Sequence, residues 1–348
     1  MAAGDLHLFQ LLKLSNLRLL PYLLILLVGC TAGLAAMLAL PHDKFLRYQG
    51  LNDSTAPTAY WIYERIHTDP SPIDVAFIGT SRIGLSMHSG RLEADLRRLG
   101  VSAKVANLHI VKTGVNMQYV VAKELLEARH VKLLVIEMTE WEDRKPHPDF
   151  IFLADTWDVL AAPAIVNLNY FSDLVRLPGR QADLFFQTQR RRLRLDAPSF
   201  VPPYEGPNLD HAEFIQTLDG RRHERLESYT QAEMDALRKE QERLTTPPLL
   251  PTSLNEIEFH LTRYYTRRIL DLAKAHHTSV VFLYTPRYGG PAQPIPYQRY
   301  ANRADLINPW AQVQDYALWW DGSHVNWEGA KRMTDFVASA LASRKELR

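Results

Sequence analysis

Two short segments of this chain carry residue types suited to acyl transfer. Gly79-Thr-Ser-Arg82 places the Ser81 hydroxyl directly after an apolar run, and Asp321-Gly-Ser-His324 places a carboxylate and an imidazole three residues apart. A serine nucleophile, a histidine base and a carboxylate that orients the base are the groups that acyl transfer through a serine requires. The two segments therefore predict a catalytic triad of Ser81, His324 and Asp321.

Each segment has a simpler interpretation when it is taken alone. Thr80 or Ser81 is also a suitable helix N-cap, because Ser and Thr hydroxyls often accept the first backbone N–H groups of a helix. The chain has 13 histidines, so one Asp-x-x-His pair is a weak signal. The triad is a more demanding prediction than either simple interpretation, because the fold must bring Ser81 and His324 into one pocket although they lie 243 positions apart. It is therefore also a prediction about the fold.

The sequence around both segments alternates between strand and helix patterns. Strands are predicted at 74–79, 104–108, 131–137 and 279–284, and helices at 89–99, 116–129, 260–277 and from Asn326 onwards. Such alternation is typical of an α/β fold with a parallel sheet and crossover helices. Catalytic residues in these sheets lie beyond the carboxyl ends of strands, which is where Ser81 falls.

An uncharged apolar stretch of 22 residues runs from Leu19 to Leu40. At about 1.5 Å per residue it is long enough to span a bilayer core. We therefore expect a cytoplasmic N-terminus at 1–18, a transmembrane anchor at 19–40 and a connector at 41–73. The only cysteine, Cys30, suggests a lipoprotein cleavage site as an alternative, but the apolar run continues past it and favours an uncleaved anchor.

The remaining composition limits the choice of function. The 348 residues carry a net charge of +1, which gives no support to a nucleic-acid partner. The basic run Arg190-Arg-Arg-Leu-Arg194 is interpreted as a solvated helix face, and no spacing suggests a metal site. Residues 142–255 lose the strand-helix alternation, so we expect a mostly helical insertion within a domain at 74–345. We interpret this insertion as a packing subdomain, with a dedicated binding module as the alternative.

Taken together, the two segments resemble the first and last blocks of the SGNH (GDSL-like) hydrolase superfamily. Gly79-Thr-Ser-Arg82 has the form seen in membrane-anchored bacterial members of an acyltransferase-like branch, and Asn326 follows the last block as in the family. The resemblance covers about 74–140 and 255–340. It implies a flavodoxin-like three-layer α/β/α sandwich and an ester-handling serine that works without a cofactor.

The same resemblance implies an oxyanion hole. The backbone N–H of Ser81 supplies one donor, Gly114 in a segment similar to the second block supplies another, and Asn116 is a substitute. The third block departs from the family, because 137–141 lacks the asparagine and has Thr139 in its neighbourhood. Losing one donor costs about 3 kcal/mol of transition-state stabilisation unless another group replaces it.

Further side chains near the predicted strand ends are candidates for substrate binding. Arg82 and Arg287 both follow strands, so either guanidinium can hold a phosphate or carboxylate of an acceptor, or pair with a buried carboxylate such as Glu137. Thr139 is a third candidate. Three tryptophans can form a sugar-stacking face, although packing in the core is the more common role for large aromatics: Trp141, Trp319 and Trp320.

The resemblance also implies a function. Its anchored members include the D-alanyl transfer protein of teichoic-acid operons and the alginate O-acetylation proteins, which commonly work beside a membrane-bound O-acyltransferase. We therefore expect a single-pass protein of the bacterial inner membrane whose extracytoplasmic domain transfers an acetyl or D-alanyl group to a cell-envelope polymer, or hydrolyses such esters. Two alternatives remain open: a non-catalytic scaffold or glycan-binding subunit, and an intracellular lipase held at the inner leaflet.

Overall fold

The computed structural model describes residues 4–51, 56–195, 204, 206–208, 214–216, 222–224, 229–244 and 248–348. Parts of the predicted segments therefore lie outside the described residues: 1–3 of the N-terminus, 52–55 of the connector, and, in the predicted insertion, much of 196–228 together with 245–247.

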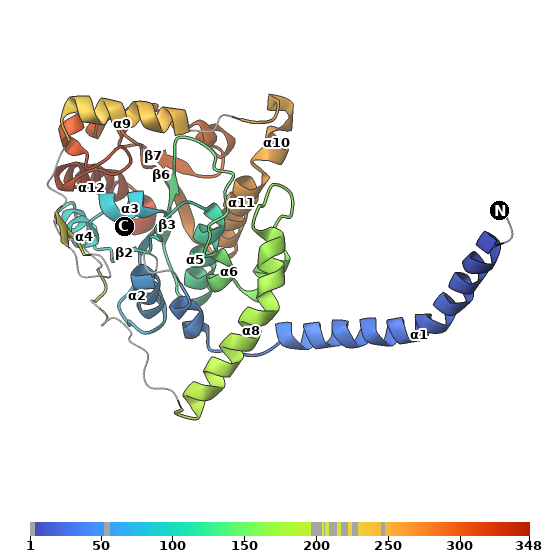
Figure 1. The fold of residues 1–348 in the computed structure, drawn as a ribbon. Helices are drawn as coiled ribbons and strands as arrows, with labels where there is room; N and C mark the ends of the chain where they lie inside the picture. The colour runs from blue at the N-terminus through green and yellow to red at the C-terminus, as the bar shows by residue number, and fades with distance from the viewer. Residues whose placement is uncertain are drawn as a thin grey trace.

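A five-stranded parallel sheet forms the centre of the domain (Figure 1). Its strands lie in the order β2-β1-β3-β6-β7, and each pairs with its neighbours in parallel. The bounds are β1 Val75–Ile78, β2 Val105–Asn107, β3 Leu133–Met138, β6 Ser279–Tyr284 and β7 Asp305–Ile307. The predicted α/β fold with a parallel sheet is confirmed, and β7 is a strand that the sequence patterns did not predict.

Helices cover most of the remaining described chain. Those of the domain are α2 Ala56–His67, α3 Ser81–Ser86, α4 Ser89–Arg98, α5 Val115–Ala128, α6 Phe150–Leu153, α7 Thr156–Leu160, α8 Tyr170–Arg192, α9 Gln231–Leu244, α10 Asn255–Glu258, α11 His260–Ala275 and α12 Trp327–Ala342. Helices α6 to α9 fall in the region predicted as a helical insertion, which also contains the antiparallel pair β4 Phe214–Gln216 and β5 Arg222–Glu224.

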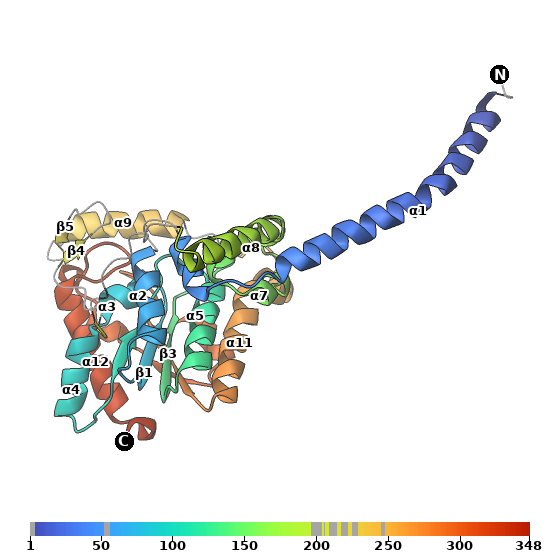
Figure 2. The same cartoon turned by 90° about the horizontal axis from the view of Figure 1, so that it is seen from below.

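Alternate residues of each central strand face two separate hydrophobic clusters. Ala76 and Ile78 of β1 pack in the cluster that contains residues of α5 and α11, whereas Val75 and Phe77 pack in the cluster that contains residues of α4 and α12. Successive side chains of a strand point to opposite faces, so both faces of the sheet are covered by helices. The view in Figure 2 shows α4 and α12 on one side of the strands and α5 and α11 on the other.

A single long helix, α1 Gly4–Leu38, precedes the domain and extends away from it (Figures 1 and 2). Its segment Leu19–Leu38 is long and apolar enough to cross a membrane, and residues 19–37 of it are exposed. The domain end of α1 is attached, because Leu38 packs against the hydrophobic cluster on the α5 side of the sheet. Pro21 lies within the helix.

Candidate active site

Ser81 is the first residue of α3, immediately after the turn that leaves β1. Thr80 is the N-cap of this helix, and its hydroxyl accepts a hydrogen bond from the Arg82 N–H at 3.2 Å. The capping role therefore belongs to Thr80, which leaves the Ser81 hydroxyl available for another partner. That partner is His324: Ser81 Oγ and His324 Nε2 lie 2.8 Å apart. Groups 243 positions apart in the sequence thus meet, as the triad requires.

The second pair of the triad forms within one turn before α12. Nδ1 of His324 lies 2.8 Å and 3.0 Å from the two carboxylate oxygens of Asp321. A carboxylate there assigns the proton to Nδ1 and leaves Nε2 to accept from the serine hydroxyl. The turn itself is fixed by Asp321, whose Oδ1 accepts the N–H groups of Ser323 at 2.6 Å and His324 at 2.8 Å.

The charge state of Asp321 follows from these contacts. Burial alone would raise the pKa of this carboxyl, but hydrogen bonds from the His324 ring and from the backbone N–H groups of Ser323 and His324 outweigh it and leave the pKa below its usual value. Asp321 is therefore ionised at neutral pH. An ionised Asp321 stabilises the imidazolium that forms when His324 takes a proton.

A buried glutamate of β3 fixes the turn that carries Ser81. One Glu137 oxygen accepts the Thr80 N–H at 2.7 Å, and the other accepts the hydroxyls of Thr80 at 3.1 Å and Thr285 at 2.7 Å. Gly79 is required for this approach, because a Cβ there would lie 2.6 Å from the Glu137 Cβ. Burial raises the pKa of the Glu137 carboxyl above its usual value in spite of these hydrogen bonds.

Arg82 is held by a second buried glutamate, Glu140. Its Nη1 donates to both Glu140 oxygens, at 3.0 Å and 2.8 Å, and to the Thr285 carbonyl at 3.0 Å. The same carboxylate accepts the backbone N–H of Arg287. Of the two roles considered for Arg82, the structure thus gives it the ion pair, and its partner is Glu140 rather than Glu137. The pair joins the loops that follow β1, β3 and β6.

Glu137 and Glu140 are functional residues that we did not assign to the site from the sequence. Their signal was present, because Glu137 is a charged residue within an otherwise apolar buried strand and Glu140 lies two residues after that strand ends. Asn107 at the end of β2 has a similar role. Its amide donates to the carbonyls of Ile83 at 3.3 Å and Met87 at 3.0 Å, and these bonds hold α3 against the end of β2. All three position Ser81 without touching its hydroxyl.

The predicted oxyanion-hole residues lie at the start of α5. Gly114 is the N-cap of this helix with φ of +139°, a conformation that favours glycine, and a Cβ there would lie 2.4 Å from the backbone nitrogen of His147. Asn116 is buried, and its side-chain oxygen accepts the same His147 N–H at 2.9 Å. The Asn116 amide oxygen therefore holds the His147 loop against α5, and only the amide nitrogen has the donor chemistry of an oxyanion hole.

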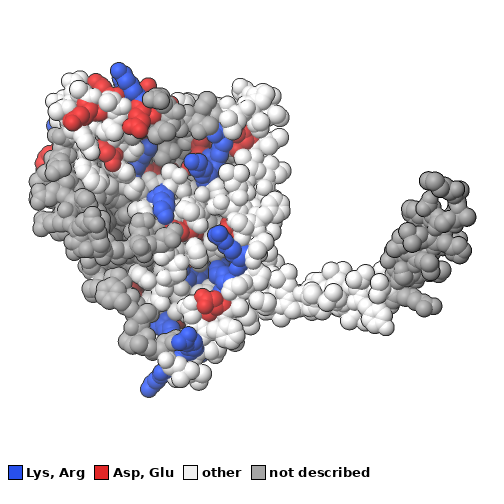
Figure 3. Space-filling view, in the orientation of Figure 1, with Lys and Arg blue, Asp and Glu red and all other residues white. Residues whose placement is uncertain are grey.

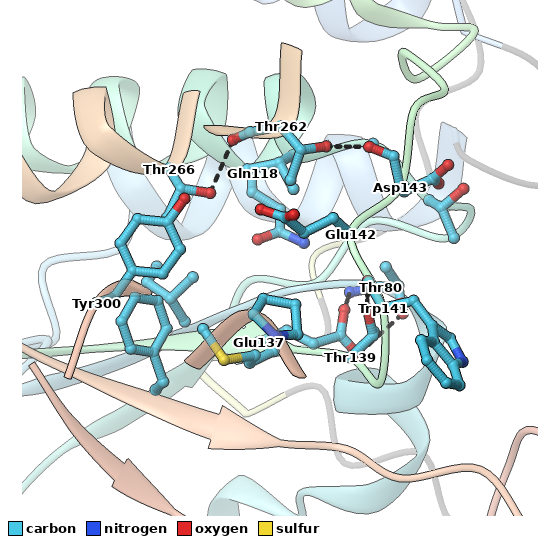
Figure 4. A pocket seen from close by; sticks show the side chains of 17 residues that line it. Thr80, Gln118, Glu137, Thr139, Trp141, Glu142, Asp143, Thr262, Thr266 and Tyr300 are labelled. Atoms are coloured by element: carbon cyan, nitrogen blue, oxygen red, sulfur yellow. Dashed lines mark hydrogen bonds between the residues drawn. The ribbon is translucent and has the colours of Figure 1, made fainter. Parts of the chain in front are cut away.

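A small pocket of about 70 Å³ connects these loops (Figure 4). Thr80, Gly114 and Thr139 all contribute to its wall, so residues next to Ser81 share a cavity with the predicted oxyanion-hole loop. Ser81 and His324 do not line it, so the catalytic atoms lie beside this pocket and not inside it. The Thr139 hydroxyl donates to the Trp141 carbonyl at 3.1 Å.

A larger cleft of about 890 Å³ continues from the small pocket, with which it shares Trp141, Glu142 and Pro296. Arg287 lines this cleft, whereas Arg82 does not. Trp141 is 43% exposed and points away from the centre of the small pocket in Figure 4, whereas Trp319 is buried in the core. Among the three tryptophans considered for sugar stacking, Trp141 has the position for it and Trp319 has the packing role.

The arrangement can perform nucleophilic chemistry at a carbonyl. Ser81, His324 and Asp321 form a continuous hydrogen-bonded chain, and both the serine and histidine side chains are only partly buried, so a substrate can reach them. Within the described ranges, we find no cluster of three or more His, Cys, Asp or Glu side chains suited to holding a metal ion.

No protein-family model matches this chain, and no curated protein shows significant similarity to it.

Proposed function

We propose that this protein is a serine O-acyltransferase or esterase of the SGNH type. The observation that carries the proposal is the chain of hydrogen bonds from Ser81 Oγ through His324 to Asp321. The fold supports it as well. The strand order β2-β1-β3-β6-β7 corresponds to the flavodoxin order 2-1-3-4-5, and Ser81 follows β1 at the point where that order reverses. We accordingly interpret the domain as a three-layer α/β/α sandwich.

The proposed reaction has two steps. In the first, Ser81 Oγ attacks the acyl carbonyl while its proton moves to His324 Nε2, and the C–O bond to the leaving group breaks as that group takes the proton from the imidazolium. In the second, an acceptor hydroxyl or water gives its proton to His324 and attacks the acyl-serine, which restores the Ser81 hydroxyl. Asp321 stays ionised throughout and stabilises the imidazolium.

Backbone N–H groups of Ser81 and Gly114 form the oxyanion hole in this proposal. Ser81 is the first residue of α3, so its N–H has no partner within the helix, and Gly114 lies across the small pocket from Thr80. Each such donor contributes about 2.7–4 kcal/mol to transition-state stabilisation. A hole without the family's third-block asparagine fits slow transfer of an acyl group to a bound acceptor better than fast general ester hydrolysis.

The large cleft is the proposed acceptor site. Its wall combines the exposed ring of Trp141 with Arg287, a pairing that suits stacking on a sugar and attraction to an anionic group. A cell-envelope polymer that carries acetyl or D-alanyl esters is the acceptor class we propose. The acyl donor is a membrane-bound O-acyltransferase in this account.

We place α1 in the bacterial inner membrane as a single span, with the domain on the extracytoplasmic side. Support comes from the length and apolar character of Leu19–Leu38 and from the envelope substrate. An alkaline phosphatase fusion after residue 348 tests the orientation. Activity of the fusion is expected, and an inactive fusion that is stably expressed would favour the inner-leaflet lipase instead.

A fluorophosphonate probe tests the serine chemistry. Wild-type protein is expected to be labelled, Ser81→Ala is expected to lose the label, and Ser339→Ala serves as the matched control, because Ser339 is an exposed serine of α12. A label that survives in Ser81→Ala would refute the assignment of the nucleophile.

One observation favours a non-catalytic alternative. The Thr139 hydroxyl, which stands in the neighbourhood of the missing asparagine, is directed to the Trp141 carbonyl. A scaffold or glycan-binding subunit would need no complete oxyanion hole. Absence of labelling in folded wild-type protein, with full function of Ser81→Ala in cells, would support that alternative.

A further inference from the structure

The region from α7 to α8 exposes many large apolar side chains. Leu168 is 85% exposed and Val175 is 81% exposed, values that are unusual for aliphatic residues of a folded domain. The exposed large apolar residues of this region are Trp157, Ile165, Leu168, Phe171, Val175 and Phe186. Large apolar side chains exposed on neighbouring elements are the kind of surface that membranes and partner proteins cover.

Helix α8 divides its residues among three faces. Leu177, Gln181 and Leu184 are buried against the domain. At 3.6 residues per turn, Phe171, Val175 and Phe186 all lie on a second face of the helix. We call this face the apolar stripe of α8. The third face carries charged side chains: Arg176, Arg180, Asp183 and Arg190. This division into apolar and basic faces is typical of helices that lie in the plane of a membrane surface.

The end of α1 lies against α8. The Leu38 carbonyl accepts a hydrogen bond from Gln181 Nε2 at 3.2 Å, and α8 crosses the base of α1 in Figure 1. If Leu19–Leu38 spans a bilayer, its roughly 30 Å length puts the membrane boundary at Leu38. Helix α8 then lies at the level of the lipid headgroups.

A cavity of about 880 Å³ beside α8 concentrates positive charge. Its lining includes four arginines and one carboxylate: Arg47, Arg176, Arg180, Arg190 and Asp183. Arg47 also forms an ion pair with Asp155 at 2.7 Å, and Arg180 donates to the backbone carbonyls of Ile151 and Ala154. Burial, followed by the nearby charge of Arg47, lowers the pKa of Arg180 to about 10. Figure 3 shows Lys and Arg side chains gathered over the lower half of α8. An acidic phosphate in this cavity would relieve the repulsion among the guanidinium groups.

We propose that α8 and the residues that precede it from Trp157 form a membrane-surface site for anionic phospholipids. The apolar stripe enters the headgroup and acyl boundary, and the arginine-lined cavity receives headgroup phosphates. The attachment of α1 at Leu38, the exposed stripe and the basic cavity all point to the same occupant, a lipid bilayer of negative surface charge. The inference needs α1 to be an anchor, but it does not depend on the serine chemistry.

Site-directed spin labelling of the full chain in nanodiscs tests this proposal. Cys30→Ser removes the only native thiol, and single cysteines then replace the tested positions. Val175→Cys and Phe171→Cys report on the stripe. Leu99→Cys is the matched control, because Leu99 is also an exposed apolar residue, at the end of α4 on the opposite side of the domain in Figure 1. Collisions with oxygen, which partitions into lipid, are compared with those of a water-soluble nickel chelate.

In discs that contain acidic phospholipid, oxygen is expected to dominate at positions 171 and 175, and the nickel chelate at position 99. Nickel access at 175 equal to that at 99 would refute the proposal. Shielding of position 175 from both reagents would also refute it, because another protein surface or a second copy would then cover the stripe.

A change of lipid charge tests the role of the arginines separately. Replacing acidic lipid with neutral lipid is expected to raise nickel access at 175 several-fold. The double variant Arg176→Gln with Arg190→Gln is expected to give that higher access even in acidic discs. Equal access in neutral and acidic discs for the otherwise unaltered chain would refute the headgroup site.

Discussion

The serine-bearing edge of the sheet and the exposed side of α8 differ in how their charged groups are balanced. At the sheet edge, Glu137 and Glu140 are buried and receive hydrogen bonds from the loops after β1 and β6. Beside α8, four arginines line one cavity with a single carboxylate, and apolar rings remain exposed. The first region satisfies its own charges and so can hold reacting atoms in fixed positions. In our proposal, the second also receives negative charge and an apolar environment from a membrane surface.

This difference predicts how each region responds to substitution. At the sheet edge, small changes of hydrogen bonding should have large effects, because the triad works only in one geometry. On α8, the stripe needs only apolar character, so conservative changes should matter little.

Of the substitutions at the sheet edge, Asp321→Asn should have the largest effect on the acylation rate. An asparagine in place of the carboxylate favours the wrong tautomer of His324, and we expect the acylation rate to fall roughly 10⁴-fold. Rates of phenol release from an activated ester measure the effect. Asp315→Asn is a suitable control, because Asp315 also caps a short helical turn but lies outside the triad. Equal rates in both variants would contradict the assigned role of Asp321.

Arg82→Met should have the next largest effect, this time on stability. The substitution leaves the Glu140 carboxylate buried without its ion-pair partner, so we expect a loss of about 3–5 kcal/mol in the free energy of unfolding. Arg91→Met is the matched control, because Arg91 pairs with Asp335 at a similar distance on the surface, and it should cost less than about 1 kcal/mol. Urea denaturation compares the two. Similar costs would mean that Arg82 does not join the three loops.

The two carboxylates of the site should respond to pH in opposite directions. The pKa of Asp321 is lowered in the folded state, so its stabilising contribution is present above its unfolded pKa of about 4 and is lost as pH falls through the folded value. The pKa of Glu137 is raised, so its contribution is present below about 4 and is lost as pH rises through the folded value.

Unfolding free energies measured against pH test this contrast. The stability difference between wild type and Asp321→Asn should shrink as the solution becomes more acidic. Relative to Glu137→Gln, wild type should instead gain stability on acidification. If acidification changed the stability of wild type in the same direction relative to Asp321→Asn and to Glu137→Gln, the environments assigned to the two carboxyls would be contradicted.

Conservative changes on α8 should have the smallest effect. Phe171→Leu and Val175→Leu keep the stripe apolar, and we expect the rate of serine labelling to change less than twofold and the membrane depth of α8 to stay the same. Val175→Asp should raise the exposure of α8 to water without changing the labelling rate. A loss of labelling in Val175→Asp would show that the two regions are coupled.

The sequence predicted the central strands and the meeting of Ser81 with His324, because apolar runs and two motifs carry those features locally. The roles of Glu137 and Glu140 were missed, since a carboxylate in a buried strand reveals its partners only after the loops of β1 and β6 come together. The ion pair of Arg82 with a buried carboxylate was considered in advance, and the structure identifies that carboxylate as Glu140.

On α8, the basic run was predicted to be a solvated helix face. The structure adds that α8, which carries the exposed apolar stripe, contacts the end of α1 through Gln181 and Leu38, a relation that sequence spacing does not contain. Strand β7 was missed because Asp305–Ile307 begins with a charged residue and contains only two apolar residues, so no apolar run marks it.

Mass spectrometry of an acyl-enzyme tests the central claim most directly. Wild-type protein is incubated with p-nitrophenyl acetate, quenched in acid and digested, and the peptide that contains Ser81 is examined for an acetyl group. We expect the modification on Ser81, a strong reduction in His324→Ala and none in Ser81→Ala. Acetylation of other residues with Ser81 unmodified, in protein that is folded and reacts with the ester, would contradict the account.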